Sequence, residues 1–171
     1  MSEMHGHHGD TESLAKEYVK FAIVIVGILS ASTLLAYSVG DGGIQSWMRW
    51  FMGVFFLVFA AFKFAGYKMF ATMFAGYDIV AKRSKLYAYA YPFIELALGL
   101  VYLLNYFGTT RDIIAALVMF VSAIGVYAEI KKRSGIHCAC LGNIIKLPLS
   151  TTSLVEDLTM GVMALAMILI G

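Results

Sequence analysis

The chain has 171 residues, of which 60% are hydrophobic and only 14% are charged, and its mean hydropathy is +0.78. Soluble globular proteins carry about 25% charged residues, so this composition excludes an ordinary soluble domain and indicates an integral membrane protein. The net charge of +2 is small and its basic residues are scattered, which argues against nucleic-acid binding. Two cysteines are too few for a secreted disulfide scaffold.

Five apolar runs predict five transmembrane helices, because one span needs about 20 apolar residues. They cover approximately residues 17–38, 46–66, 86–106, 112–130 and 154–170. No small-residue cleavage site follows the first run, so we expect a retained anchor helix. A weaker apolar stretch follows the second run as far as Phe74 and is either an extension of that helix or a separate interfacial helix. The fold class is therefore an all-α, polytopic membrane helix bundle embedded in lipid.

The basic residues predict the orientation of these spans. An N-terminus on one side of the membrane, side A, places most Lys and Arg residues on that side, with Arg49 and Arg111 on the opposite side B. The basic residues of side A are Lys16, Lys20, Lys68, Lys82, Arg83, Lys85, Lys131, Lys132, Arg133 and Lys146. Cytoplasmic loops are enriched in Lys and Arg, so side A is predicted to face the cytoplasm of a cell (inner) membrane.

The only two cysteines, Cys138 and Cys140, follow His137 in the segment that connects the fourth and fifth runs. Two thiols at i and i+2 can share one soft metal ion such as Cu(I), can oxidise to a short-loop disulfide, or can pack as small apolar side chains. A nearby cation, either His137 or the basic residues 131–133, would favour the thiolate that redox exchange needs. The residues alone leave these alternatives open.

Three more histidines, His5, His7 and His8, lie in the polar N-terminal stretch, and on the predicted topology they share side A with the cysteines. Such clusters often bind divalent or soft metal ions, and a functionless remnant of cloning is the alternative. Methionines recur at helical spacing in three sets, Met48/Met52, Met69/Met73 and Met160/Met163/Met167. Thioethers are Cu(I) ligands, but ordinary packing between apolar helices explains the same spacing.

Lys63 and Glu95 are the ionisable residues set deepest in the apolar runs, and an intramembrane charge indicates a functional site by default. Their helices are consecutive and antiparallel, and Glu95 would lie about 13 Å deep at a rise of 1.5 Å per residue. A carboxylate at this depth needs a partner, so we expect a Lys63–Glu95 ion pair. The alternatives are a pair that only fixes helix packing, or a Lys63 side chain that reaches the interface.

The remaining interior polar residues have simpler explanations. Glu156 and Asp157, near the start of the last run, suit the positive end of a helix dipole without any role in catalysis. Ser122 and Glu129 are the interior polar residues of the fourth run.

Several motifs together resemble the family of the methylamine-utilisation protein MauE, which is related to DoxX-like membrane proteins. They are Lys63 near the end of one span, Pro92-Phe93-Ile94-Glu95-Leu96 with Gly99 in the next, and Cys138-Ala139-Cys140-Leu141-Gly142 before the last. The resemblance covers roughly residues 46–171, with Leu141 where the family usually has Phe. It implies a four-helix bundle that assists disulfide formation or thiol handling in a partner, with Cys138 and Cys140 as the redox pair and Lys63 and Glu95 as intramembrane polar residues.

The resemblance also divides the chain into three parts. We expect a polar, His-containing tail over residues 1–16, an additional transmembrane helix over residues 17–39 and a MauE/DoxX-like domain over residues 46–171. The leading hypothesis is a membrane thiol-redox protein that acts with a thioredoxin-like or substrate protein. Its difficulty is that disulfides form more readily outside the cytoplasm.

The competing hypothesis is a transporter or metallochaperone for a soft metal ion such as Cu(I). Its ligands would be Cys138, Cys140 and His137 at the cytoplasmic mouth, with His5, His7 and His8 collecting the ion. Reduced thiolates are the form that binds Cu(I), so this hypothesis accommodates a cytoplasmic cysteine pair.

Overall fold

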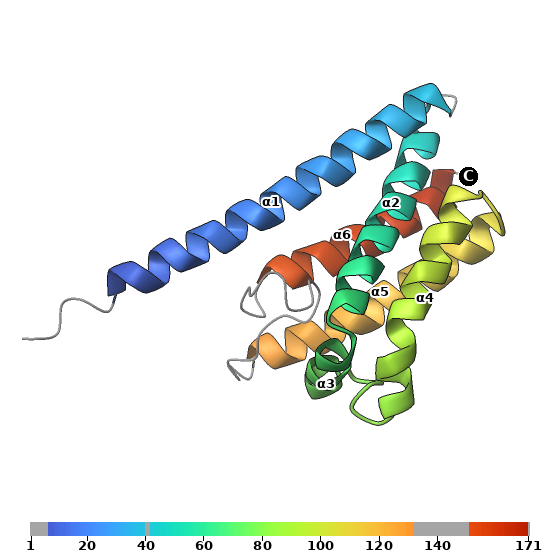
Figure 1. Ribbon diagram of the computed structural model, residues 1–171. Helices are drawn as coiled ribbons and strands as arrows, with labels where there is room; N and C mark the ends of the chain where they lie inside the picture. Colours follow the sequence, from blue (N-terminus) through green and yellow to red (C-terminus); the bar gives the residue numbers. More distant parts are fainter. Residues whose placement is uncertain (1–6, 40–41, 132–150, 171) are drawn as a thin grey trace, which may run out of the picture.

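A computed structural model describes the backbone of residues 7–39, 42–131 and 151–170, and the side chains of residues 16–39, 42–131 and 154–170. In this part of the chain all regular structure is helical (Figure 1). The helices are α1 (His7–Ser38), α2 (Ile44–Ala65), α3 (Tyr67–Tyr77), α4 (Lys85–Leu103), α5 (Gly108–Lys131) and α6 (Thr151–Ile170). The predicted all-α membrane bundle is confirmed. We keep side A for the end that carries α3, and side B for the turn between α4 and α5.

Four of the described helices are long and apolar enough to cross a membrane, namely α1 from Lys16 onwards, α2, α4 and α5. This is one fewer than the five predicted spans. The fifth prediction falls on α6, which is 20 residues long. Its side chains are described only from residue 154, and that part is roughly 26 Å long, slightly less than the hydrocarbon core of a bilayer.

The second predicted span is followed by a separate short helix. Helix α2 ends at Ala65, Gly66 has non-helical dihedral angles, and α3 then runs for 11 residues. Its buried face consists of Phe70, Ala71, Phe74 and Tyr77. Because 11 residues span only about 16 Å, α3 covers side A of the bundle rather than crossing it.

Helices α2 and α4 form a close antiparallel pair because each presents a glycine to a leucine of the other. A Cβ atom at Gly53 would lie 2.5 Å from Leu103, and one at Gly99 would lie 2.9 Å from Leu57. Small residues allow two membrane helices to approach closely and gain dispersion contacts. The second antiparallel pair is α5 and α6, and the apolar core lies between the two pairs. Its buried members include Phe56, Met52, Met160 and Met167, so these methionines fill the core.

Helix α1 lies on the outside of this arrangement and diverges from the other helices toward its amino-terminal end (Figure 1). Only 17% of its apolar window is buried. Its contact with α2 includes a hydrogen bond of 3.0 Å from Trp47 Nε1 to Thr33 Oγ1. The helix begins at His7, not at residue 17, so part of the predicted polar tail is helical.

Candidate functional site

Lys63 and Glu95 meet in the interior of the bundle, near side A. Lys63 is in the last turn of α2 and Glu95 is in the middle of α4, and their side chains form an ion pair in which Nζ donates to Oε1. The residues are 4% and 3% exposed. An ammonium and a carboxylate this deeply buried are tolerated only when they are paired and hydrogen-bonded.

Aromatic rings from three helices surround the Lys63 ammonium. Its Nζ atom lies 5.7 Å from the ring centroid of Phe59 in α2, 5.6 Å from that of Phe70 in α3 and 5.2 Å from that of Tyr91 in α4. Cations within about 6 Å of a ring are attracted by its quadrupole, and the attraction grows when water is excluded. The lysine therefore ties α2, α3 and α4 together at side A.

A second buried carboxylate reaches the same region from the other helix pair. Ser122 of α5 donates a hydrogen bond of 2.8 Å to Asp157 of α6, and both residues are buried. Asp157 lies within electrostatic range of Lys63 and Glu95. The sequence predicts only a helix-dipole role for Asp157, because its position near a helix start does not show which way the side chain faces.

A third buried carboxylate, Asp78, belongs to the loop between α3 and α4. Asp78 is fully buried and accepts hydrogen bonds of 2.9 and 2.7 Å from the backbone N–H groups of Val80 and Ala81. Burial raises the pKa of Asp78 above its ordinary value, while the two backbone bonds and the charge of Lys82 act in the opposite direction. The loop packs directly on α5, since a Cβ atom at Gly125 would lie 3.1 Å from the Asp78 Cα atom.

These charges form one centre, which we call the side-A centre: Lys63, Glu95, Asp157 and Asp78. The lysine brings α2, α3 and α4 together, and Asp157 and Asp78 connect α6 and the α3–α4 loop to the same region. Among the residues whose side chains are described, no three His, Cys, Asp or Glu residues are grouped so as to hold a metal ion. What the arrangement provides is one ion pair, Lys63–Glu95, and two further buried carboxylates that accept hydrogen bonds.

The cysteines and histidines of the predicted site are not part of this description. Cys138, Cys140, His137 and His5 lie outside the described residues. His7 and His8 belong to the first turn of α1, and the structure describes their backbone alone. The segment 132–150, which carries the cysteines, joins the side-A ends of α5 and α6.

A comparison with protein families decides the family membership. Residues 41–170 match the model of the methylamine utilisation protein MauE, which is most of the chain. The chain belongs to the MauE family. No curated protein and no solved structure matches it.

The extent of the match agrees with the predicted resemblance. It covers α2 to α6 and includes Lys63, Glu95 and the Cys138–Cys140 motif, whereas α1 precedes it. This protein is thus a multi-pass membrane protein of the MauE type that carries a further helix before the matched region.

Proposed function

We propose that this MauE-family protein is a membrane thiol-redox protein in which Cys138 and Cys140 alternate between a dithiol and a disulfide. The observation that carries the proposal is the family match, which includes the stretch with the chain's only two cysteines. Two thiols separated by one residue and flanked by His137 have the composition of a reactive pair, because a nearby cation favours the thiolate.

The proposed reaction is thiol–disulfide exchange with a partner protein. A thiolate of the partner attacks the sulfur of one cysteine, the other cysteine leaves as a thiolate, and a mixed disulfide forms. The second partner thiolate then displaces the cysteine from the mixed disulfide. Two electrons and two protons pass from the partner dithiol to the Cys138–Cys140 pair, so the step is balanced without any further reactant.

The side-A centre supports the proposal because one of its residues, Asp157, lies near the start of α6, which directly follows the segment that carries the cysteines. Segment 132–150 continues directly from α5 and leads directly into α6, the two helices joined by the Ser122–Asp157 hydrogen bond. We propose that Lys63 and Glu95 position the side-A ends of the helices that carry this segment, acting through the core and not on the thiols themselves.

Redox titration of the purified protein tests the exchange chemistry. We expect the number of alkylated thiols to fall from two to none in one two-electron step. Its slope should be about 30 mV per tenfold change in the ratio of reduced to oxidised protein. A Cys138→Ser variant should show no such step. Two thiols that stay alkylatable at every potential would remove the proposal.

The soft-metal hypothesis remains a second candidate, favoured by the predicted placement of His5, His7 and His8 on the side of the cysteines. Anaerobic Cu(I) titration of the wild type beside a Cys138→Ser/Cys140→Ser variant separates the two functions. Stoichiometric binding that the variant loses would support the metal site, whereas equal weak binding by both proteins would favour redox exchange.

We also propose that side A faces the cytoplasm of the inner membrane, on the distribution of basic residues. An impermeant maleimide applied to intact cells should leave Cys138 and Cys140 unlabelled until the membrane is permeabilised. Ready labelling from outside would show the opposite orientation. The cysteines would then lie outside the cytoplasm, where disulfides form more readily.

A further inference from the structure

Side A of the bundle carries a set of exposed basic residues, which we call the side-A basic surface. They belong to α3, the loop after it, the start of α4 and the end of α5, and they are Lys68, Lys82, Arg83, Lys85 and Lys131. The acidic side chains that the structure describes at this end of α2 to α6 are withdrawn from the solvent. Asp78, Glu129 and Asp157 are buried, and Glu156 is half-buried.

Contacts between these elements hold the basic residues together at one end of the molecule (Figure 1). The start of α3 is joined to α4 by a hydrogen bond of 2.8 Å from the Tyr67 hydroxyl to the backbone carbonyl oxygen of Tyr89. The loop is joined to the last turns of α5 by the ion pair between Lys82 and Glu129, at 3.2 Å. The side-A basic surface is therefore continuous across α3, α4 and α5.

The segment that adjoins this surface has the same sign of charge in its sequence. Residues 132–150 continue directly from Lys131 and contain Lys132, Arg133 and Lys146, but no Asp or Glu. The nearest acidic residues on the N-terminal side, Asp10 and Glu12, belong to the first turns of α1, which diverges from the other helices (Figure 1). The segment can thus only add positive charge to this end of the bundle.

Exposed apolar side chains lie among the basic residues of the same elements. They are Met69, Ile79, Val80, Leu86 and Tyr89, and Leu86, beside Lys85, is 79% exposed. At a bilayer interface, apolar side chains lie below the headgroups while the ends of long basic side chains reach the phosphates. An acidic soluble protein would satisfy the basic groups but not this apolar component. The mixture therefore favours a lipid surface.

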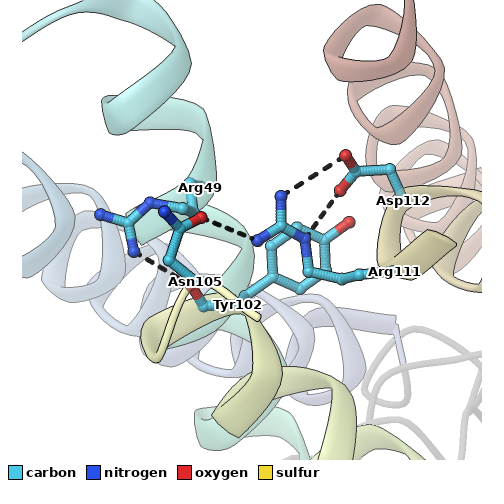
Figure 2. A network of polar contacts seen from close by, with 5 residues as sticks. All are labelled: Arg49, Tyr102, Asn105, Arg111 and Asp112. Atoms are coloured by element: carbon cyan, nitrogen blue, oxygen red, sulfur yellow. Dashed lines mark hydrogen bonds and ion pairs between the residues drawn. The ribbon is translucent and has the colours of Figure 1, made fainter. Parts of the chain in front are cut away.

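The two arginines of side B are arranged differently (Figure 2). Arg111 is 4% exposed and donates to the two carboxylate oxygens of Asp112 at 3.0 and 3.4 Å. Arg49 is half-buried and donates to the main-chain carbonyl oxygens of Tyr102 and Leu103, both at 3.1 Å. These arginines hold the protein together internally, whereas the basic side chains of side A point outward.

We propose that the side-A basic surface binds the anionic headgroups of phospholipids, with Lys68, Arg83 and Lys85 as its main contacts. Clusters of four to eight basic residues next to a membrane helix attract anionic lipids. Helix α3 is short and amphipathic, with Phe70 and Phe74 buried against the bundle and Lys68 exposed, as is typical of a helix that lies at the interface. The binding goes beyond the proposed thiol exchange and does not depend on it.

The test measures lipid retention by the purified full-length protein, using native mass spectrometry. The probe is an equimolar mixture of phosphatidylglycerol and zwitterionic phosphatidylcholine with identical acyl chains. The key variant is Lys68→Gln/Arg83→Gln/Lys85→Gln. All three side chains are exposed, so this variant should fold as the wild type does. The matched control, Lys68→Arg/Arg83→Lys/Lys85→Arg, keeps the three charges.

We expect the wild type and the charge-conserving control to retain phosphatidylglycerol in preference to phosphatidylcholine. The preference should fall by about 10-fold or more in the glutamine variant, since each basic residue near an anionic surface contributes roughly a factor of five. Equal retention of the two lipids by the wild type, or an unchanged preference in the glutamine variant, would overturn the proposal. Binding of soluble oligoglutamate without any preference for phosphatidylglycerol would also overturn it, because the surface would then suit an acidic protein.

Discussion

At side A, Lys63 meets a carboxylate on the neighbouring helix and three aromatic rings, whereas at side B, Arg49 meets main-chain carbonyl oxygens beside a cavity of about 490 Å³. Both cations belong to α2, about 21 Å apart along the helix. The first is enclosed with its counter-charge, and the second is oriented by main-chain carbonyl oxygens in the lining of a cavity.

The difference shows how one membrane helix supports two kinds of polar site. A buried ion pair whose partners lie on different helices stabilises one arrangement of those helices, because separating them leaves two uncompensated charges. Polar groups that line a cavity can instead regain hydrogen bonds from water when a neighbouring side chain is removed. We therefore expect substitutions at side A to cost more stability than substitutions in the lining of the side-B cavity.

The largest expected effect is that of Glu95→Ala at side A. Removing the carboxylate leaves the Lys63 ammonium buried without its counter-charge, which should lower the free energy of unfolding by about 4 kcal/mol. Reversible unfolding in detergent measures the change. A loss below about 1 kcal/mol, the value for an exposed pair, would show that water reaches this site.

A double variant separates the role of this pair in folding from its role in the proposed exchange. Lys63→Met/Glu95→Leu replaces both charges by apolar side chains and should recover most of the lost stability. Because the proposal treats the pair as positioning residues, we expect the folded double variant to exchange thiols more slowly. An unchanged rate of thiol exchange would show that the pair has only a structural role.

The matching substitution at side B, Arg111→Met, should cost less although Arg111 is as deeply buried as Glu95. Asp112 would lose its guanidinium partner, but the adjacent cavity gives water access to the carboxylate. We expect a loss of about 2 kcal/mol. A loss equal to that of Glu95→Ala in the same unfolding assay would contradict the distinction between a closed and an open end.

A smaller effect is expected for Ser122→Ala, which removes the hydrogen bond between α5 and α6. Asp157 would lose one donor, with an expected cost of about 1 kcal/mol. Ser32→Ala is a suitable control, because Ser32 is also buried but donates to a carbonyl of its own helix. Equal costs for the two variants would argue against a contribution of Asp157 to helix pairing.

The smallest predicted effect is a pH dependence from Asp78. Its raised pKa means that the folded protein holds this proton at a pH where the unfolded chain has lost it. Stability from this group is therefore complete below the ordinary carboxylate pKa and declines as the pH rises through the raised value. Asp78→Asn should remove that part of the slope when unfolding midpoints are compared from acidic to neutral pH. An identical slope in both proteins would contradict the assignment.

Much of the fold could be predicted from hydropathy alone, because each long apolar run has only one way to satisfy its backbone in lipid. Lys63 and Glu95 could be singled out for the same reason, since charges deep in apolar runs stand out. Their meeting depends on the antiparallel course of consecutive helices, which the sequence also implies. The MauE motifs added the family, which the comparison confirms.

Other parts of the two sites could not be predicted. Arg49 and Arg111 lie near the ends of spans, where a charge normally faces water, and only helix rotation determines that Arg111 turns inward. Asp157 depends on the packing of α6 on α5, and Asp78 on the close approach of its loop to Gly125. These contacts depend on how two elements pack together, so the residue pattern of a single segment does not predict them.

The most direct test of the central claim mixes the oxidised protein with one equivalent of reduced thioredoxin, whose two active-site thiols serve as a model partner. We predict that two thiols appear on this protein, at Cys138 and Cys140, while the two thiols of thioredoxin are lost, as measured by mass-tagging after acid quenching. A Cys138→Ser variant should leave thioredoxin reduced. If the wild-type pair is oxidised and thioredoxin nevertheless keeps both thiols, the protein does not carry out the proposed exchange.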